Sequence, residues 1–233
     1  MRDFTKDEQW AMLREFIQKK LDVGEPSPHM KIVGFLGKDK PIRERLWMAG
    51  CYAVPYSIIT AEVLWTEWPL ERALSDPGGL EEWIYANWKD IHTRTERRCV
   101  RTPAKFTECL LGYCRWMHHT LPNTLEEIKG LGNDEAYDLL WESVNSVMYL
   151  GRYINIRILD FYHRYCGISA KLYDIRSIGG WSPKKMLALL YPENKEVLLG
   201  PGKYGDPLAN KLATEAMYFY IEDGLKIEFY IFA

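Results

Sequence analysis

Long apolar runs are absent from this sequence of 233 residues, and so is a strong net charge of either sign. No stretch reaches the roughly 20 apolar residues that a membrane-spanning helix needs. The first ten residues, MRDFTKDEQW, are charged where the core of a signal peptide would be apolar. The formal net charge is -2, so contacts with a polyanion have to come from local surface patches. We therefore expect a cytoplasmic protein without a membrane partner.

Cysteine is scarce and unpatterned. The five cysteines form no Cys-x-x-Cys pair, and an odd number suits neither a disulfide scaffold nor a zinc site. His118 and His119 are adjacent, so on a helix they point in different directions and make a poor ligand pair. The P-loop, the GxGxxG fingerprint and the GxSxG elbow are also absent. We expect no metal and no cofactor, and the sequence does not resemble a kinase, a dinucleotide enzyme or an α/β-hydrolase.

Helical periodicity dominates what is present. Apolar residues recur at helical spacing after a capping box at Thr5–Glu8, and across residues 42–65, where Pro55 must kink or divide the helix. Further helices are expected at about 79–90, 103–121, 125–131, 134–165 with an interruption near Gly151, 183–190 and 207–222. The sequence thus predicts an all-α fold, a helical bundle. We divide it into an N-terminal helix (1–24), a linker (25–40) and one helical domain (41–233).

The densest charge lies in residues 92–105, where five cationic side chains accompany one carboxylate, that of Glu96. Guanidinium groups bind phosphate or carboxylate through two parallel hydrogen bonds, and the helix that begins at Pro103 adds free backbone N–H groups. The sequence therefore predicts an anion site formed by Arg94, Arg97, Arg98, Arg101 and Lys105. The alternative is a solvated loop whose arginines form ion pairs with acidic helices.

A second basic segment spans residues 152–185, with seven cationic side chains and two carboxylates. Gly179 and Gly180 permit an unusual backbone path, and Ser182 then caps the helix that Pro183 begins. A glycine-rich turn before a helix can bind an anion, here with Arg176, Gly179, Gly180, Ser182 and Lys184. Ordinary connections between helices use the same residue types, so this interpretation is the less specific of the two.

One carboxylate falls inside an apolar helical pattern. Glu62 precedes Trp65 by three residues, so the two would share a face of the helix. In aromatic surroundings a carboxylate has a raised pKa and can act as a general base. The alternative is a buried ion pair with Arg45 or with an arginine of the 94–101 segment.

An ordered series of motifs resembles a known family. The motifs of this series are Arg-x-Arg-Leu-Trp at 43–47, Thr-Ala-Glu at 60–62, Trp-x-x-Trp-Pro at 65–69, the arginines of 94–101, Leu-Gly-Arg-Tyr at 150–153 and Asp-x-Arg-x-x-Gly-Gly-Trp-Ser-Pro at 174–183. Over about residues 43–192 they resemble the phage amino acid:DNA transferases, which are related to α-glutamyl/putrescinyl-thymine pyrophosphorylases. That family is helical and distantly similar to helix-hairpin-helix DNA glycosylases. Residues 125–132, LEEIKGLG, resemble the hairpin, although Asn133 and Asp134 depart from its usual pattern.

The resemblance implies a step in the hypermodification of thymine in phage DNA. Pyrophosphorylated 5-hydroxymethyluracil in double-stranded DNA would lose pyrophosphate while the amine of a free amino acid or polyamine attacks the exocyclic methylene carbon. The leaving polyanion needs fixed cations, for which the two basic segments are candidates. The incoming ammonium needs a base, for which Glu62 and then Asp174 are candidates. Residues 41–233 would then be the catalytic domain.

The resemblance also suggests roles for other side chains. Arg45 or Arg152 would bind the carboxylate of the amino acid or the pyrophosphate. The modified base has to leave the stack, and the rings that could receive it are Tyr52, Tyr56, Trp65 and Trp181. Two alternatives are a glycosylase-like DNA-binding protein without transferase activity and a helical phage scaffold or adaptor. The candidates for the attacking amine are glycine, serine, glutamate and a polyamine.

Overall fold

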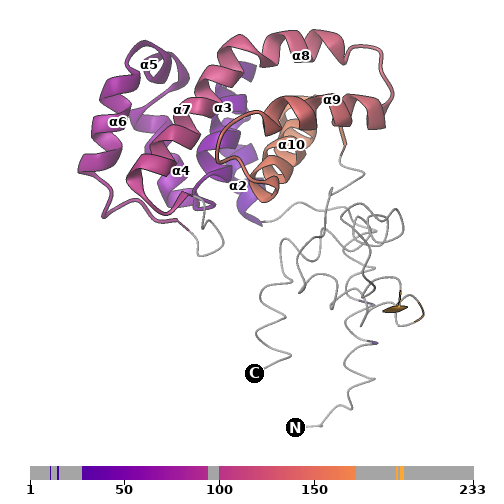
Figure 1. The fold of residues 1–233 in the computed structure, drawn as a ribbon, viewed down its shortest axis with the longest axis horizontal. Helices are drawn as coiled ribbons and strands as arrows, with labels where there is room; N and C mark the ends of the chain where they lie inside the picture. Colours follow the sequence, from indigo (N-terminus) through magenta and orange to yellow (C-terminus); the bar gives the residue numbers. More distant parts are fainter. Residues whose placement is uncertain are drawn as a thin grey trace. The chain divides into compact units, whose positions relative to one another are not determined.

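The computed structural model describes residues 28–93 and 100–171, together with the single positions 11, 15, 193, 195 and 196. The chain divides into two compact units, one of Pro28–Leu172 and one that combines Met1–Ser27 with Tyr173–Ala233. Within the described ranges every regular element is helical and none is a strand, which confirms the all-α prediction (Figure 1). None of these helices is long and apolar enough to cross a membrane.

Short connections join the helices of the first unit. In chain order these are α2 (Pro28–Gly37), α3 (Ile42–Ala53), α4 (Ile58–Glu67), α5 (Leu70–Ser75), α6 (Pro77–Ala86), α7 (Pro103–His119), α8 (Leu121–Glu127), α9 (Asn133–Asn145) and α10 (Arg152–Cys166). Pro55 divides the 42–65 region as predicted, and the interruption near Gly151 separates α9 from α10. The expected start of α8 near Leu125 is wrong, because Pro122 fits the first turn of a helix. Neither α2 nor α5 was expected, and α2 lies within the 25–40 segment.

The centre of this unit is α3, which packs against α2, α4, α7 and α10. Every residue of α3 from Leu46 onward is buried. Gly50 lets α7 approach closely, because a Cβ atom there would collide with the Tyr113 ring. The Tyr113 hydroxyl donates to the backbone oxygen of Leu46 at 2.5 Å and accepts from the Tyr162 hydroxyl at 2.6 Å. These bonds join α3, α7 and α10 where they meet, and burial raises the pKa of both phenols well above the usual value.

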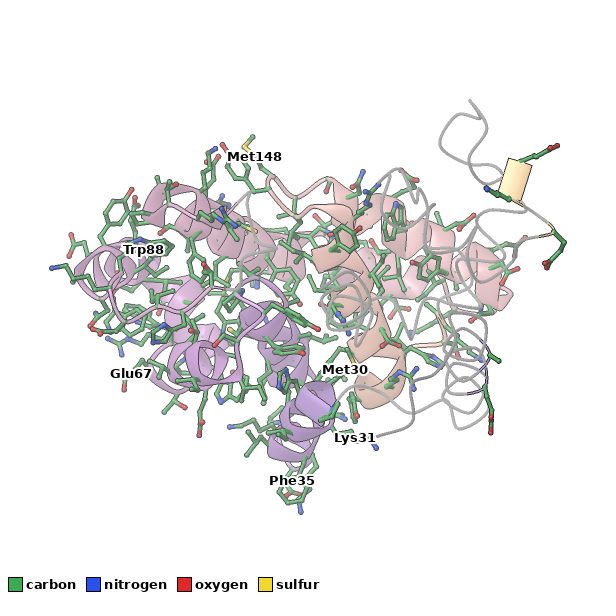
Figure 2. All side chains as sticks on the ribbon, turned by 90° about the horizontal axis from the view of Figure 1, so that it is seen from below. Met30, Lys31, Phe35, Glu67, Trp88 and Met148 are labelled. Carbon is green, nitrogen blue, oxygen red and sulfur yellow. The ribbon has the colours of Figure 1, made fainter. Side chains whose placement is uncertain are left out.

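Several apolar side chains of the described residues are largely exposed, among them Phe35 and Met148. Phe35 of α2 is 65% exposed and Met148, in the connection from α9 to α10, is 59% exposed. Figure 2 shows Phe35 pointing away from α2, and Met148 pointing outward from the connection. On the other face of α2, Met30 and Val33 are buried, so this helix packs one side on the core and leaves an apolar side uncovered.

Candidate functional site

The described part of the arginine-rich segment lies where α7 begins. Arg101 is exposed, and the hydroxyl of the next residue, Thr102, accepts the backbone N–H of Lys105 at 3.4 Å and caps the helix. Pro103 follows the cap because the first helical position needs no N–H donor, so the predicted start of this helix is confirmed. Arg101 and the exposed Lys105 therefore flank the positive end of the helix dipole.

Tyr149 links the start of α10 to the start of α7. The Lys105 Nζ lies 5.7 Å from the centre of the Tyr149 ring, a cation–π contact. Tyr149 has a φ of +63°, which strains the backbone of an aromatic residue. After this turn Gly151 precedes α10 without a side-chain cap, and Arg152 is the first helical residue. Arg101, Lys105, Tyr149 and Arg152, together called the basic corner, thus combine three predicted anion-binding residues at two helix N-termini.

A groove of about 360 Å³ lies beside the basic corner, between α7 and the connection from α9 to α10. Its charged lining residues are Glu108 and Arg115, with Gly112 between them on the same face of α7. A Cβ atom at Gly112 would lie 3.1 Å from Cγ1 of Val147, so glycine here lets the connection approach the helix. The remaining lining residues of this α7 groove are Trp116, His119, Thr120, Ser146, Val147 and Met148.

A second groove, of about 400 Å³, shares Arg115 and His119 with the α7 groove. Its other lining residues come from α5, α6 and α7 and are mostly apolar: Ala73, Leu74, Pro77, Leu111, Cys114 and His118. Burial raises the pKa of the Cys114 thiol to about 12. Because the thiolate is the nucleophilic form, this cysteine is not a reactive group near neutral pH.

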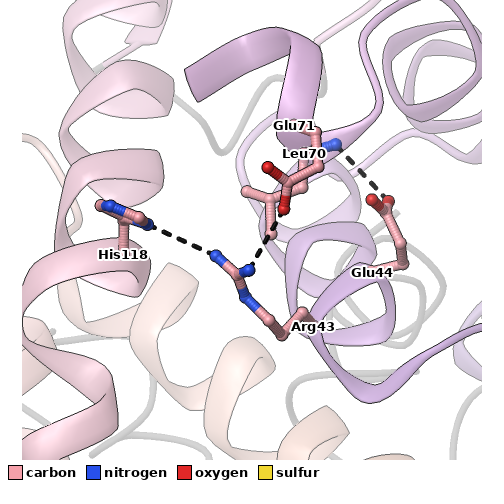
Figure 3. Close-up of polar contacts among 5 residues, drawn as sticks. All are labelled: Arg43, Glu44, Leu70, Glu71 and His118. Atoms are coloured by element: carbon pink, nitrogen blue, oxygen red, sulfur yellow. Dashed lines mark hydrogen bonds and ion pairs between the residues drawn. The ribbon is translucent and has the colours of Figure 1, made fainter. Parts of the chain in front are cut away.

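Arg43 joins three helices beside the second groove (Figure 3). Its Nη1 donates to Oε1 of Glu71 in α5 at 3.1 Å, and its Nη2 lies 3.3 Å from Nδ1 of His118 in α7. The carboxylate of Glu44 accepts the backbone N–H of Leu70 at 3.5 Å, at the start of α5. The Arg43 and Glu71 side chains are more than half exposed, so this pair adds little stability and mainly orients the helices.

The family model of the amino acid:DNA transferases matches residues 28–229 of the sequence. The chain belongs to this family. The match includes every helix from α2 to α10 and confirms the resemblance seen in the ordered motifs. The name of the family describes the transfer of an amino acid to DNA, so an amino acid and DNA are the substrates of the transferase. No curated protein and no solved structure matches the sequence.

The two arginines predicted to bind a carboxylate or pyrophosphate lie at opposite ends of α10. Arg152 begins this helix, whereas Nη1 of Arg45 donates to the backbone oxygen of Tyr165 in its last turn at 2.6 Å. The ends of a 15-residue helix are about 20 Å apart. A cation at a helix C-terminus is favoured by the helix dipole, so Arg45 has a structural partner in the transferase. Its role in ligand binding stays a prediction.

The described rings predicted to stack on an extruded base are buried. Tyr52, Tyr56 and Trp65 are 0%, 8% and 7% exposed, so a base would reach them only if their neighbours moved. Tyr56 has a φ of +55°, and its hydroxyl accepts Nη2 of Arg157 at 2.8 Å. Arg157 is only 3% exposed. Arg157 belongs to the second basic segment, and its position within the apolar pattern 154–162 was the sequence signal for its burial.

Glu62 is exposed rather than buried, because it lies on the outer side of α4. Its neighbours Ile59 and Val63 are 70% and 43% exposed. The alternative ion pair with Arg45 is not formed, since that guanidinium bonds to Tyr165. The α4 helix therefore presents a carboxylate between apolar side chains to solvent. The role of Glu62 as a base in the transferase stays a prediction.

The α8–α9 connection, whose sequence resembles a DNA-binding hairpin, carries no basic side chain at the start of α9. Gly130 has a φ of +83°, and the first turn of α9 holds the carboxylates of Asp134 and Glu135. Asn133 bonds through its side chain to the backbone of Lys171. Negative charge in the first turn of a helix disfavours phosphate there. The basic corner is therefore the better phosphate site among the described residues.

The other predicted site residues of the transferase lie outside the described residues. They are Arg94, Arg97, Arg98, Asp174, Arg176, Gly179, Gly180, Trp181, Ser182 and Lys184. In the part of the chain that the structure describes, no three His, Cys, Asp or Glu side chains are grouped to hold a metal ion. The described candidate site consequently consists of the basic corner and the α7 groove.

Proposed function

We propose that this transferase attaches an amino acid to pyrophosphorylated 5-hydroxymethyluracil in double-stranded DNA, as a step in phage thymine hypermodification. The amine nitrogen forms a bond to the exocyclic methylene carbon. The bond from this carbon to oxygen breaks, and pyrophosphate leaves with the electron pair. The nitrogen loses a proton to a base, for which Glu62 and Asp174 are the candidates.

The observation that carries the proposal is the basic corner. Negative charge accumulates on the leaving pyrophosphate, and fixed cations aimed at that charge lower the barrier. Lys105, in the first turn of α7, contacts the Tyr149 ring, and Tyr149 lies three residues before Arg152, the first residue of α10. An anion bound there would also interact favourably with both helix dipoles.

The test is mass spectrometry of nucleosides from DNA that contains pyrophosphorylated 5-hydroxymethyluracil, after incubation with the protein and each amino acid. We expect one amine adduct for every pyrophosphate released. DNA with unphosphorylated 5-hydroxymethyluracil is the control and should give no adduct. An abasic product would instead identify a glycosylase-like activity, and no adduct with any amino acid or polyamine would refute the proposal.

A further inference from the structure

Two opposite charges of the described residues, those of Glu108 and Arg115, line the α7 groove. Neither the Glu108 carboxylate nor the Arg115 guanidinium makes a hydrogen bond or an ion pair among the described residues, and both residues are exposed. Seven positions separate them, which is about 10 Å along a helix, so they are too far apart to pair with each other. Among the described residues both charges are therefore left for a ligand that carries both signs.

Between these charges the groove is lined by backbone and apolar atoms. Gly112 lies about midway and has no side chain, and Val147 packs close to it. Trp116 and Met148 add apolar surface, and the Trp116 indole is held in place because its Nε1 donates to Ser143 Oγ at 3.0 Å. A volume of about 360 Å³ is within the usual range for small-molecule sites. The groove therefore combines a cation, an anion and an apolar wall.

We infer that the α7 groove binds the free α-amino acid, with its carboxylate on Arg115 and its ammonium on Glu108; this assignment rests on the proposed function. A guanidinium binds a carboxylate with two parallel hydrogen bonds. A DNA strand fits the groove less well, because Glu108 would repel its phosphates. A polyamine would leave Arg115 without a counter-charge. Lys105 lies one turn before Glu108, so the amine end of the amino acid is next to the basic corner.

Calorimetric titration of the full-length protein with each of the twenty amino acids tests the assignment, with and without a DNA duplex. The tightest-binding amino acid is then compared with its α-amide, which lacks the carboxylate. The wild type should bind the acid about tenfold more tightly than the amide, and Arg115→Gln should abolish this difference. Glu108→Gln should weaken both ligands about equally, by about tenfold.

Two charge-neutralising variants outside the groove, Glu82→Gln and Lys89→Gln, are the matched controls and should bind like the wild type. All four variants should unfold at the same temperature as the wild type, since the replaced side chains are exposed. Absence of binding of all twenty amino acids, or an acid-over-amide preference that survives in Arg115→Gln, would overturn the assignment.

The transfer assay on modified DNA separates this assignment from the proposed reaction. If the wild type forms the adduct and both groove variants keep its KM for the amino acid, the groove is not the amino-acid site and the proposed reaction stands. If the acid-over-amide preference depends on Arg115 but no adduct forms, the groove assignment stands and the proposed reaction fails.

Discussion

Single residues decide how closely the helices approach one another. Gly50 and Gly34 each lie against an aromatic ring, those of Tyr113 and Tyr165, at positions where any side chain would collide. The sequence contains no signal for these contacts, because glycine inside a helix costs about 1 kcal/mol relative to alanine and normally weakens the prediction of a helix. The tertiary packing around these rings gives the two glycines their function.

Replacement of Gly50 by alanine should lower the free energy of unfolding by about 1–3 kcal/mol, because the new methyl group collides with the hydrogen-bonded Tyr113 ring. Gly78→Ala is the control, since a Cβ atom there has no neighbour within 4 Å. This second variant should be as stable as the wild type or slightly more stable. Urea denaturation measures both, and equal stabilities of the two variants would contradict the close packing of α3 on α7.

Buried thiols should make stability depend on pH in alkaline solution. Burial raises the pKa of Cys114 and of Cys166 to about 12. Above about pH 8.5 the unfolded chain loses these protons while the folded chain keeps them, so the free energy of unfolding falls as the pH rises from there towards 12. Each thiol contributes at most about 1.4 kcal/mol per pH unit. Urea denaturation at pH 8, 9 and 10 should show the fall, and Cys166→Ala should reduce it; an increase would contradict the burial.

At the scale of elements, local capping contacts determine where several helices begin. Ser57, Asp76 and Thr102 each accept the backbone N–H of the third residue after them. These signals act within one turn, which is why the start of α7 was predictable. The short α5 has only six residues, too few for a recurring apolar pattern. α2 is apolar on both its buried and its exposed side, so its sequence lacks the contrast that marks an amphipathic helix.

Removal of the α7 cap should weaken the fold at the basic corner. Thr102→Ala leaves the Lys105 N–H without its hydroxyl acceptor and should reduce the free energy of unfolding by about 1 kcal/mol. Thr102→Ser keeps the hydroxyl and should retain most of that stability. Thermal unfolding followed by circular dichroism provides the comparison. If Thr102→Ser and Thr102→Ala lower the free energy of unfolding equally, the hydroxyl does not cap the helix.

At the scale of the whole molecule, attraction to DNA has to be local. The formal net charge is -2, so the overall field does not favour a polyanion. In the described residues the basic corner carries exposed cations at the starts of two helices, α7 and α10. Nonspecific affinity for DNA should consequently be modest and depend strongly on salt.

The salt dependence of duplex binding should change when the basic corner is neutralised. The logarithm of affinity falls linearly with the logarithm of salt concentration. The double variant Lys105→Gln with Arg152→Gln should make this negative slope shallower by about 2, because each lost phosphate contact removes about one unit. Lys129→Gln on the exposed α8–α9 connection is the control and should leave the slope unchanged. Fluorescence anisotropy measures the affinities from which the slopes are obtained, at roughly 50 to 200 mM salt, where affinities that depend on phosphate contacts fall strongly. An unchanged slope in the double variant would place the phosphate contacts elsewhere.

The sequence by itself determined what depends on short-range chemistry. Helical periodicity established the all-α fold, and Pro55 and Pro103 marked where helices are divided or begin. Charge density along the chain singled out Arg101, Lys105 and Arg152 before their positions in space were known. The ordered motifs pointed to the family that the comparison then showed. Each of these signals acts within a few residues or can be read directly from the order of the residues.

Only the tertiary structure decided which of these segments meet. It brought Lys105 to the start of α10 through Tyr149, and it closed the α7 groove with residues 146–148. It also left Glu62 exposed and buried Arg157, two outcomes that composition and spacing do not distinguish. Periodicity shows that one face of a helix is buried but not which helix covers it. That choice depends on contacts between segments far apart in the chain, which no local signal encodes.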